Sequence, residues 1–150
     1  MSLQEKIESD FKKAFKAGDV LRRSVLVMLK AAILNKSKEK GGSATLQDED
    51  VLAMISLEIK RRRDAIPQYR AGGRDDVAEK EEKEIAILSY YLPPQLSDDE
   101  IAKIADEAII QAQAKGEKDF GKVMAIVSPR TKGKAEGGRV AKIVKAKLLS

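Results

Sequence analysis

The sequence predicts an all-α protein with an N-terminal helical bundle of about four helices and a small C-terminal domain of three helices. Aromatic residues make up only 4% of the 150 residues, and the apolar residues are mostly Ala, Leu, Ile and Val on a background of Lys and Glu, which favours helix. Most glycines and prolines fall between segments in which apolar residues recur at helical spacing. The Pro93-Pro94 pair interrupts backbone hydrogen bonding most strongly. We therefore expect two domains, residues 1–92 and 93–150.

The first two helices are delimited by local signals. Ser2 and Glu5 have the spacing of a capping box, in which each side chain accepts a hydrogen bond from the backbone of the other residue. Gly18 is expected to end this helix in the left-handed conformation, and Asp19 to cap the next. That second helix, from Val20 to about residue 38, is apolar around most of its circumference, which is typical of a central, buried helix.

The third and fourth helices complete the predicted bundle. Thr45 with Asp48 is a second capping signal, and Pro67 should end or kink the helix that follows. A fourth helix is predicted from Asp75 to Leu92, charged in its first half and apolar in its second. Its last eight residues also resemble a strand, but no partner strand is evident nearby. We therefore predict helix there as well.

Three shorter helices are predicted after the proline pair. A capping box formed by Ser97 and Glu100 starts the fifth helix, and Gly116 is expected to end it. The sixth begins at residue 119 or 120 and ends at Pro129, and the seventh begins near residue 135 or 136. A domain of this size is near the lower limit for independent folding.

Three absences narrow the possible functions, because the sequence contains no His, Cys or Trp. Disulfides, zinc sites built on Cys or His, and nucleophile systems that need an imidazole base are excluded. We predict no catalytic residue, no metal and no cofactor, and whether the chain takes part in an enzyme stays open. The longest apolar stretch is too short to span a membrane, and the N-terminus is too polar for a signal peptide. The default expectation is a cytoplasmic protein without membrane contact.

Positive charge is concentrated at the C-terminal end. Residues 120–150 contain eight basic side chains and one acidic side chain, within a chain whose net charge is +5. Such a density of like charge repels itself unless a polyanion or an acidic neighbour offsets it, and nucleic-acid phosphate is the obvious polyanion. The predicted phosphate contacts are Lys122, Arg130, Lys132, Lys134, Arg139 and Lys142. The alternative is that these are ordinary solvated helix faces, partly neutralised by the acidic fifth helix.

Two further features have open interpretations. A secondary basic patch consists of Lys60, Arg61, Arg62 and Arg63. It either follows a phosphate backbone or pairs with Glu58, Asp64 and the acidic residues of 79–84. Tyr90 and Tyr91, beside the proline pair, either form a stacking platform or pack between the domains.

Several strings in the sequence carry a family resemblance. They are Arg22-x-Ser24-Val25-Leu26-x-Met28-Leu29-Lys30-Ala31-Ala32, Tyr91-Leu92-Pro93-Pro94-Gln95-Leu96-Ser97, Phe120-Gly121-Lys122-Val123-Met124 and Lys132-Gly133-Lys134-Ala135-Glu136-Gly137-Gly138. Together they resemble the GatB/YqeY family, small free-standing proteins similar to the C-terminal helical and tail regions of GatB, a component of aspartyl/glutamyl-tRNA amidotransferase. The resemblance covers nearly the whole chain and implies an all-helical, two-domain protein.

The resemblance also implies a tRNA-associated role. In the amidotransferase the tail region contacts the outer corner of the tRNA, whereas the chemistry occurs in another domain that has no counterpart here. We therefore expect a non-catalytic module that binds tRNA or another structured RNA, accessory to tRNA-dependent amidation together with a protein partner. The family label would be a carbon–nitrogen ligase with glutamine as amido donor. The alternative is a helical protein–protein adaptor that does not bind RNA.

Overall fold

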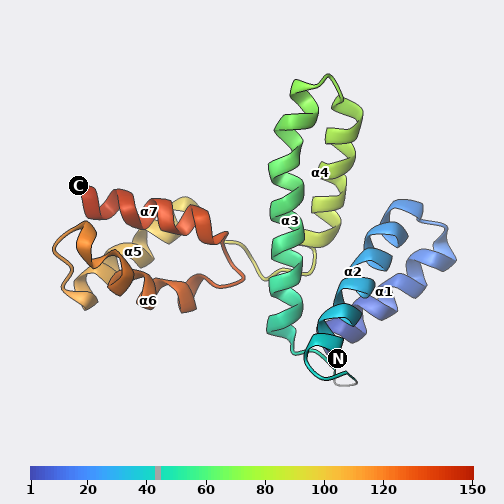
Figure 1. Ribbon diagram of the computed structural model, residues 1–150, viewed down its shortest axis with the longest axis horizontal. Coiled ribbons are helices and arrows are strands. Elements are labelled where there is room, and N and C mark those ends of the chain that lie inside the picture. Colours follow the sequence, from blue (N-terminus) through green and yellow to red (C-terminus); the bar gives the residue numbers. More distant parts are fainter. Residues whose placement is uncertain (43–44) are drawn as a thin grey trace. The chain divides into compact units, whose positions relative to one another are not determined.

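A computed structural model describes residues 1–42 and 45–150, and it confirms the all-α prediction (Figure 1). The described residues form seven α-helices and one 3₁₀ helix, and they contain no strand. They divide into two compact units, Met1–Leu92 and Pro93–Ser150, which are described separately below.

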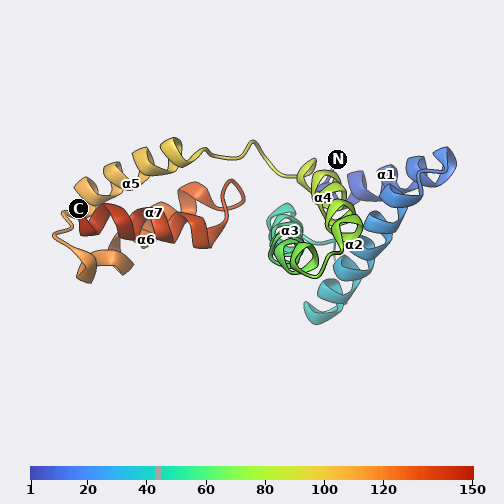
Figure 2. The ribbon, with the colours of Figure 1, turned by 90° about the horizontal axis from the view of Figure 1, so that it is seen from above.

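The N-terminal unit consists of two helical hairpins, as Figures 1 and 2 show. One pairs α1 (Leu3–Ala17) with α2 (Val20–Glu39), and the other pairs α3 (Asp48–Ala71) with α4 (Asp75–Ser89). The core between them is aliphatic, and its fully buried members include Ile7, Leu26, Leu29, Ile55 and Leu88. Helix α2 contacts α1, α3 and α4, which is the central position predicted for it.

Local signals delimit the first hairpin as predicted. The Ser2 hydroxyl accepts a hydrogen bond from the Glu5 N–H at 3.2 Å, and the Glu5 carboxylate accepts one from the Ser2 N–H at 3.1 Å. Gly18 has a φ of 69°, the left-handed cap conformation that glycine adopts without steric cost. Asp19 caps α2 by accepting from the Arg22 N–H at 3.1 Å.

Helix α3 starts and ends at other residues than the sequence suggested. The helix begins at Asp48 with Gln47 as its N-cap, so Thr45 does not cap it. The Asp48 carboxylate instead accepts a hydrogen bond from the N–H of Leu3 at 2.9 Å. Pro67 lies inside the helix, which continues to Ala71. A proline removes only one backbone donor, and four further residues remain helical beyond it.

Two other corrections concern the second and fourth helices. Helix α4 ends at Ser89, three residues earlier than predicted, and the rest of the strand-like segment forms a turn. Helix α2 is central, but it is not buried all round. Val20, Val27 and Leu34 are 64%, 49% and 55% exposed on the side that faces away from the core.

The C-terminal unit contains α5 (Asp98–Ala112), η1 (Glu117–Asp119), α6 (Phe120–Thr131) and α7 (Gly137–Leu149). Its core is built from small and β-branched side chains, with Ile101, Val123, Val127, Val140 and Val144 almost completely buried. Each of the three α-helices contacts the other two, so the core lies where all three meet.

The capping box that starts α5 is confirmed, because the Ser97 hydroxyl accepts from the Glu100 N–H at 3.1 Å and the Glu100 carboxylate accepts from the Ser97 N–H at 3.3 Å. The predicted ends shift by a few residues. Helix α5 ends at Ala112 and not at Gly116, since Gln113 takes the left-handed conformation with a φ of 54°. Helix α6 passes through Pro129 to Thr131, and α7 begins at Gly137.

Candidate nucleic-acid interface

The loop between α6 and α7 is tied to the segment that precedes α5. The Leu96 N–H donates to the carbonyl of Lys134 at 2.8 Å, and the Gln95 side-chain amide donates to the carbonyl of Gly133 at 3.0 Å. We call these two hydrogen bonds the clasp. It brings together two of the strings that carry the family resemblance, which are far apart in the sequence. The loop that bears Lys132 and Lys134 is therefore fixed to the rest of the unit.

The two arginines predicted as phosphate contacts are engaged within the unit. Arg130 lies 2.9 Å from a carboxylate oxygen of Glu107 on α5. Arg139 lies 2.9 Å from a carboxylate oxygen of Asp98, and it also donates a hydrogen bond to the carbonyl of Leu96. Arg139 therefore stabilises the segment next to the clasp.

Two further basic residues of the C-terminal block pair with acids. Lys147 lies 3.2 Å from Asp106 of α5, and Lys145 lies 3.7 Å from Glu117 of η1. Four of the eight cations in residues 120–150 are thus paired with acidic residues of the preceding segment, as the alternative interpretation of this block expected. These pairs are largely exposed, so each contributes little to stability.

The other four cations of the block are exposed and form no ion pair within the residues that the structure describes: Lys122, Lys132, Lys134 and Lys142. Lys132 and Lys134 share the α6–α7 loop, and Lys142 lies five residues into α7. Lys122 lies in the first turn of α6, about 15 Å along the helix axis from Lys132. The structure therefore groups Lys132 and Lys134 and places Lys122 at the opposite end of α6.

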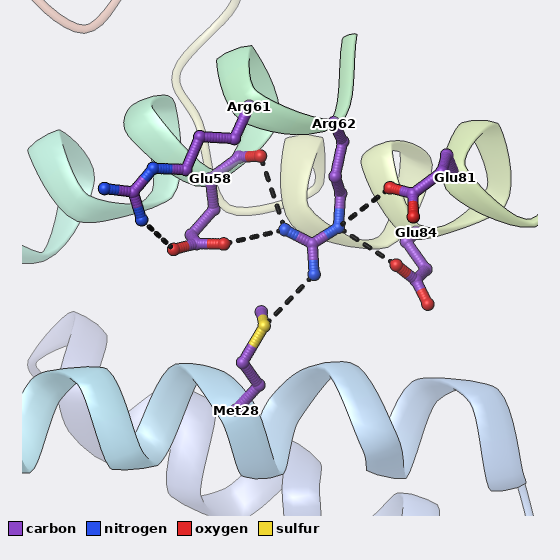
Figure 3. Close-up of polar contacts among 6 residues, drawn as sticks. All are labelled: Met28, Glu58, Arg61, Arg62, Glu81 and Glu84. Carbon is purple, nitrogen blue, oxygen red and sulfur yellow. Dashed lines mark hydrogen bonds and ion pairs between the residues drawn. The ribbon is translucent and has the colours of Figure 1, made fainter. Parts of the chain in front are cut away.

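The secondary basic patch is centred on Arg62, whose side chain is only 12% exposed (Figure 3). Its Nη1 lies 2.8 Å from a carboxylate oxygen of Glu58 on α3, and its Nε lies 3.0 Å from Glu84 and 3.7 Å from Glu81 on α4. Its Nη2 faces the Met28 sulfur of α2 at 3.1 Å. Arg62 therefore joins the two helical hairpins and does not present its charge to solvent.

The rest of this patch lies on the exposed side of α3. Arg61 is 3.3 Å from Glu58, and Lys60 is 2.9 Å from Asp64. Arg63 is exposed as well. Pairing with neighbouring acids, which was the alternative to a phosphate-binding role, is what the structure shows for Lys60, Arg61 and Arg62.

Three carboxylates surround the single, largely buried Arg62 cation, and two pKa values in this cluster are shifted. Burial opposes the charged form of Arg62, but its hydrogen bonds with Glu58 and Glu84 outweigh burial and raise the pKa of the guanidinium. Burial, together with repulsion from Glu84, raises the pKa of Glu81 above its usual value. Near neutral pH the charged form of Glu81 therefore costs stability.

We expect Glu81→Gln to raise the free energy of unfolding near pH 7. A raised carboxyl pKa in the folded state gives stability at low pH that is lost as pH rises through that pKa. Glutamine stays neutral, so the gain should shrink as pH falls and the wild-type carboxyl takes up a proton. Urea unfolding between pH 4 and pH 8 measures this, with the exposed Glu79→Gln on the same helix as control. A loss of stability at pH 7 would show that the attraction to Arg62 dominates.

Tyr90 and Tyr91 do not form a flat stacking platform. The Tyr91 ring is buried in the N-terminal core, and its hydroxyl donates to the Asp10 carboxylate at 2.7 Å. Burial and this hydrogen bond raise the pKa of the Tyr91 hydroxyl. Tyr90 is exposed and meets Tyr91 edge-on, with ring centroids 5.2 Å apart. Tyr91 is therefore a packing residue of the N-terminal unit.

No cluster of acidic side chains suited to a metal ion occurs in residues 1–42 or 45–150. In the same ranges, no helix is long and apolar enough to cross a membrane. Reasoning from the residues missed the structural roles of Gln95 and Leu96. The only signal in the sequence was that both stand in a string that carries the family resemblance.

Fold and site together define a class: an all-helical protein of two compact units, with a basic C-terminal unit whose loop cations are free to meet an anion. The chain belongs to the YqeY family, because the family described as Yqey-like protein matches it over residues 4–148. This confirms the resemblance noted from its sequence strings.

Curated relatives share this family assignment. The chain is 26% identical over 132 residues to "Altered inheritance of mitochondria protein 41, mitochondrial" of Pyrenophora tritici-repentis, covering 87% of this chain and 71% of the relative. Proteins of the same name from Candida glabrata and Lachancea thermotolerans are 26% and 35% identical over 71% and 67% of this chain. The matches span 60% and 54% of those two relatives.

Proposed function

We propose that this chain is a non-catalytic helical module that binds tRNA or another structured RNA. The observation that carries the proposal is the group of exposed lysines without acidic partners in the C-terminal unit, above all Lys132 and Lys134 in the clasped loop. Lysines without an acidic partner contribute the most binding free energy when they contact phosphate. No internal ion pair has to be broken, and counterions bound to the nucleic acid are released.

The six predicted phosphate contacts have different roles in this proposal. Lys132 and Lys134 make the primary contacts, since the clasp holds their loop in place and reduces the entropy lost on binding. Lys142 and Lys122 extend the contact surface along α7 and α6. Arg130 and Arg139 share their charge with Glu107 and Asp98, so their contribution to binding is smaller.

An accessory role in tRNA-dependent amidation is part of the proposal. It is supported by family membership and by the resemblance to the tail region of GatB. In such a role the module docks on the tRNA, and a protein partner performs the ligase chemistry. The cytoplasmic location stays a prediction. The names of the relatives contain the word mitochondrial. A mitochondrial location is therefore the alternative, and cell fractionation would distinguish the two.

Lys132→Glu/Lys134→Glu is expected to weaken tRNA binding on the order of 30- to 60-fold at 0.1 M salt, since two lost phosphate contacts lower the salt slope by about 1.4 to 1.8. The measurement is fluorescence anisotropy of labelled tRNA with the full chain across a salt series. An unrelated RNA hairpin tests whether tRNA is preferred.

The matched control is Lys12→Glu/Lys13→Glu, which changes the net charge by the same amount on exposed lysines of the N-terminal unit. Equal weakening by both double variants would mean that only total charge matters, and it would refute the site. Wild-type binding that ignores RNA identity and vanishes near physiological salt would refute the function.

The alternative function, a protein–protein adaptor, would not dock its partner through Tyr91, because that ring is buried. A protein-docking role would therefore need another surface, and the N-terminal unit contains one.

A further inference from the structure

We propose that the outward side of α2 is a docking site for an acidic amphipathic helix of a partner protein. This inference is independent of RNA binding, because it concerns the N-terminal unit alone. It rests on an exposed apolar stripe, on the charge beside that stripe and on a cavity at one end of it.

The stripe follows a heptad pattern. Val20, Ser24, Val27, Ala31 and Leu34 are spaced alternately four and three residues apart, and all five are exposed. This is the spacing at which one helix presents a seam to another helix in a coiled coil. Val20 and Leu34 are separated by 14 positions, about 21 Å along the axis. We call these five residues the outward stripe.

The outward stripe is distinct from the face of α2 that holds the fold together. Leu26, Leu29 and Ile33 are buried in the core on the opposite side of the helix. Beside the stripe, Met28 turns toward Arg62, and Lys30 turns toward Phe11 and Glu8 of α1. The exposed aliphatic surface is therefore a narrow strip between neighbouring elements, the shape that a single helix covers.

The segment that carries the outward stripe is rich in positive charge. Residues 12–38 contain eight basic side chains and one acidic side chain, Asp19. Three of these cations pair with acids, Arg22 with Asp19, Lys30 with Glu8 and Lys36 with Glu39, whereas Lys38 continues the spacing of the stripe one turn beyond Leu34 and is exposed. Arg23 lies next to the stripe and contacts the Phe15 ring at 5.5 Å, and within the described residues it has no carboxylate partner. A helix that settles on the stripe would place its flanking positions near these cations. Acidic flanking residues on the partner would complement them.

A cavity of about 450 Å³ opens at the Leu34 end of the stripe. Ala31 and Leu34 of the stripe line it together with Ile7 and Ile33, and Glu8 and Lys30 stand among its polar lining. This volume accommodates a large side chain. A docked helix would therefore have a pocket for one anchoring residue, which is how interfaces concentrate their binding energy.

Two other occupants fit less well. A second copy of this chain docked through the same stripe would bring its own cations against these, which costs binding energy. A membrane surface is broad, and a helix that lies in one presents a wide apolar face, whereas this stripe is narrow and contains Ser24 and Ala31. An acidic helix satisfies both the shape and the charge.

The test uses the full chain and a synthetic helical peptide of about three heptads, with Leu at its core positions and Glu at its flanking positions. We expect the peptide to bind, as measured by fluorescence anisotropy, and its counterpart with Lys at the flanking positions not to bind. Val27→Ser/Leu34→Ser should weaken binding about tenfold or more. Ile110→Ser/Leu149→Ser, which removes two still more exposed aliphatics from the C-terminal unit, should leave it unchanged.

Circular dichroism of both variants confirms that they remain folded, and Lys132→Glu/Lys134→Glu checks that the peptide does not bind the C-terminal basic block. Several results would overturn the proposal: no binding of the acidic peptide, equal binding of both peptides, or equal loss in the two serine variants. If the chain binds vesicles rich in phosphatidylserine but not the acidic peptide, the occupant of the stripe is a membrane surface and the proposal is wrong. If sedimentation shows a dimer that Val27→Ser/Leu34→Ser abolishes, the occupant is a second copy of the chain, which also refutes it.

Discussion

Replacing Arg62 with methionine is expected to destabilise the N-terminal unit by about 3–5 kcal/mol, because it leaves buried carboxylates without their cation. The side chains of Arg62 and Glu84 are 12% and 11% exposed, and Glu58 and Glu81 are also largely covered. Methionine fills a similar volume, so packing changes little and the loss reports the uncompensated charge. The measurement is urea unfolding followed by circular dichroism near pH 7.

The pH dependence identifies the cause of this loss. Removing the cation takes away the attraction that opposes the raised pKa of Glu81, so this pKa rises further and the folded state regains stability as pH falls and the carboxyl is protonated. The control is Arg61→Met on the same helix, where the side chain is 66% exposed and contacts Glu58 alone among the three carboxylates. If the two variants unfold at the same urea concentration, Arg62 does not have the proposed structural role.

Ile101→Ala is expected to unfold the C-terminal unit at 37 °C while α1 to α4 remain folded. Ile101 is fully buried in the smaller core, and truncating such a residue costs about 2–5 kcal/mol. A unit of this size has little stability to lose. Amide hydrogen exchange by NMR measures the effect in both units at once, and we expect protection to disappear in α5 to α7 only. Binding of tRNA should disappear with it.

Ile110→Ala provides the matched control, because it is the same substitution on the same helix at a residue that is 78% exposed. It should leave protection unchanged throughout. Loss of protection in α1 to α4 of the Ile101→Ala variant would show that the two units fold as one. That outcome would refute the proposal that residues 1–92 and 93–150 are separate domains.

The sequence predicted those parts of the fold that depend on neighbouring residues. The boxes at Ser2 and Ser97 and the left-handed Gly18 were correct, because a cap needs only residues within one helical turn. Burial also repeats with the turn of the helix, as at Ile55 and Ile59 of α3 and at Val140 and Val144 of α7, in keeping with the helical spacing of apolar residues in the sequence.

Predictions failed where distant residues decide the outcome. Asp48 belongs by sequence to a cap with Thr45, but the N–H of Leu3 competes for its carboxylate. Gln113 ends α5 in a conformation more usual for glycine or asparagine, so its sequence gives no warning. Pro67 remained inside α3, which is joined to α4 on both sides of the proline, by Arg62 with Glu84 before it and by Arg70 with Glu82 after it.

The candidate site was predictable only as a region. Counting charges located the basic block, but whether a cation is free depends on which acids the fold brings beside it. Arg130 and Lys132 are two residues apart, yet Arg130 meets Glu107 and Lys132 meets no acid in the described part of the chain. For the same reason the exposed side of α2 was missed. A helix that is apolar on opposite sides has the same sequence pattern whether one side or both sides are buried.

The clasp also has a mechanical consequence. Its two hydrogen bonds close a circuit of chain in which the joined residues Gln95 and Gly133 are 38 positions apart. A pull on this loop would act on the clasp as well as on the covalent connections to α6 and α7, so part of the load would reach the segment before α5 directly.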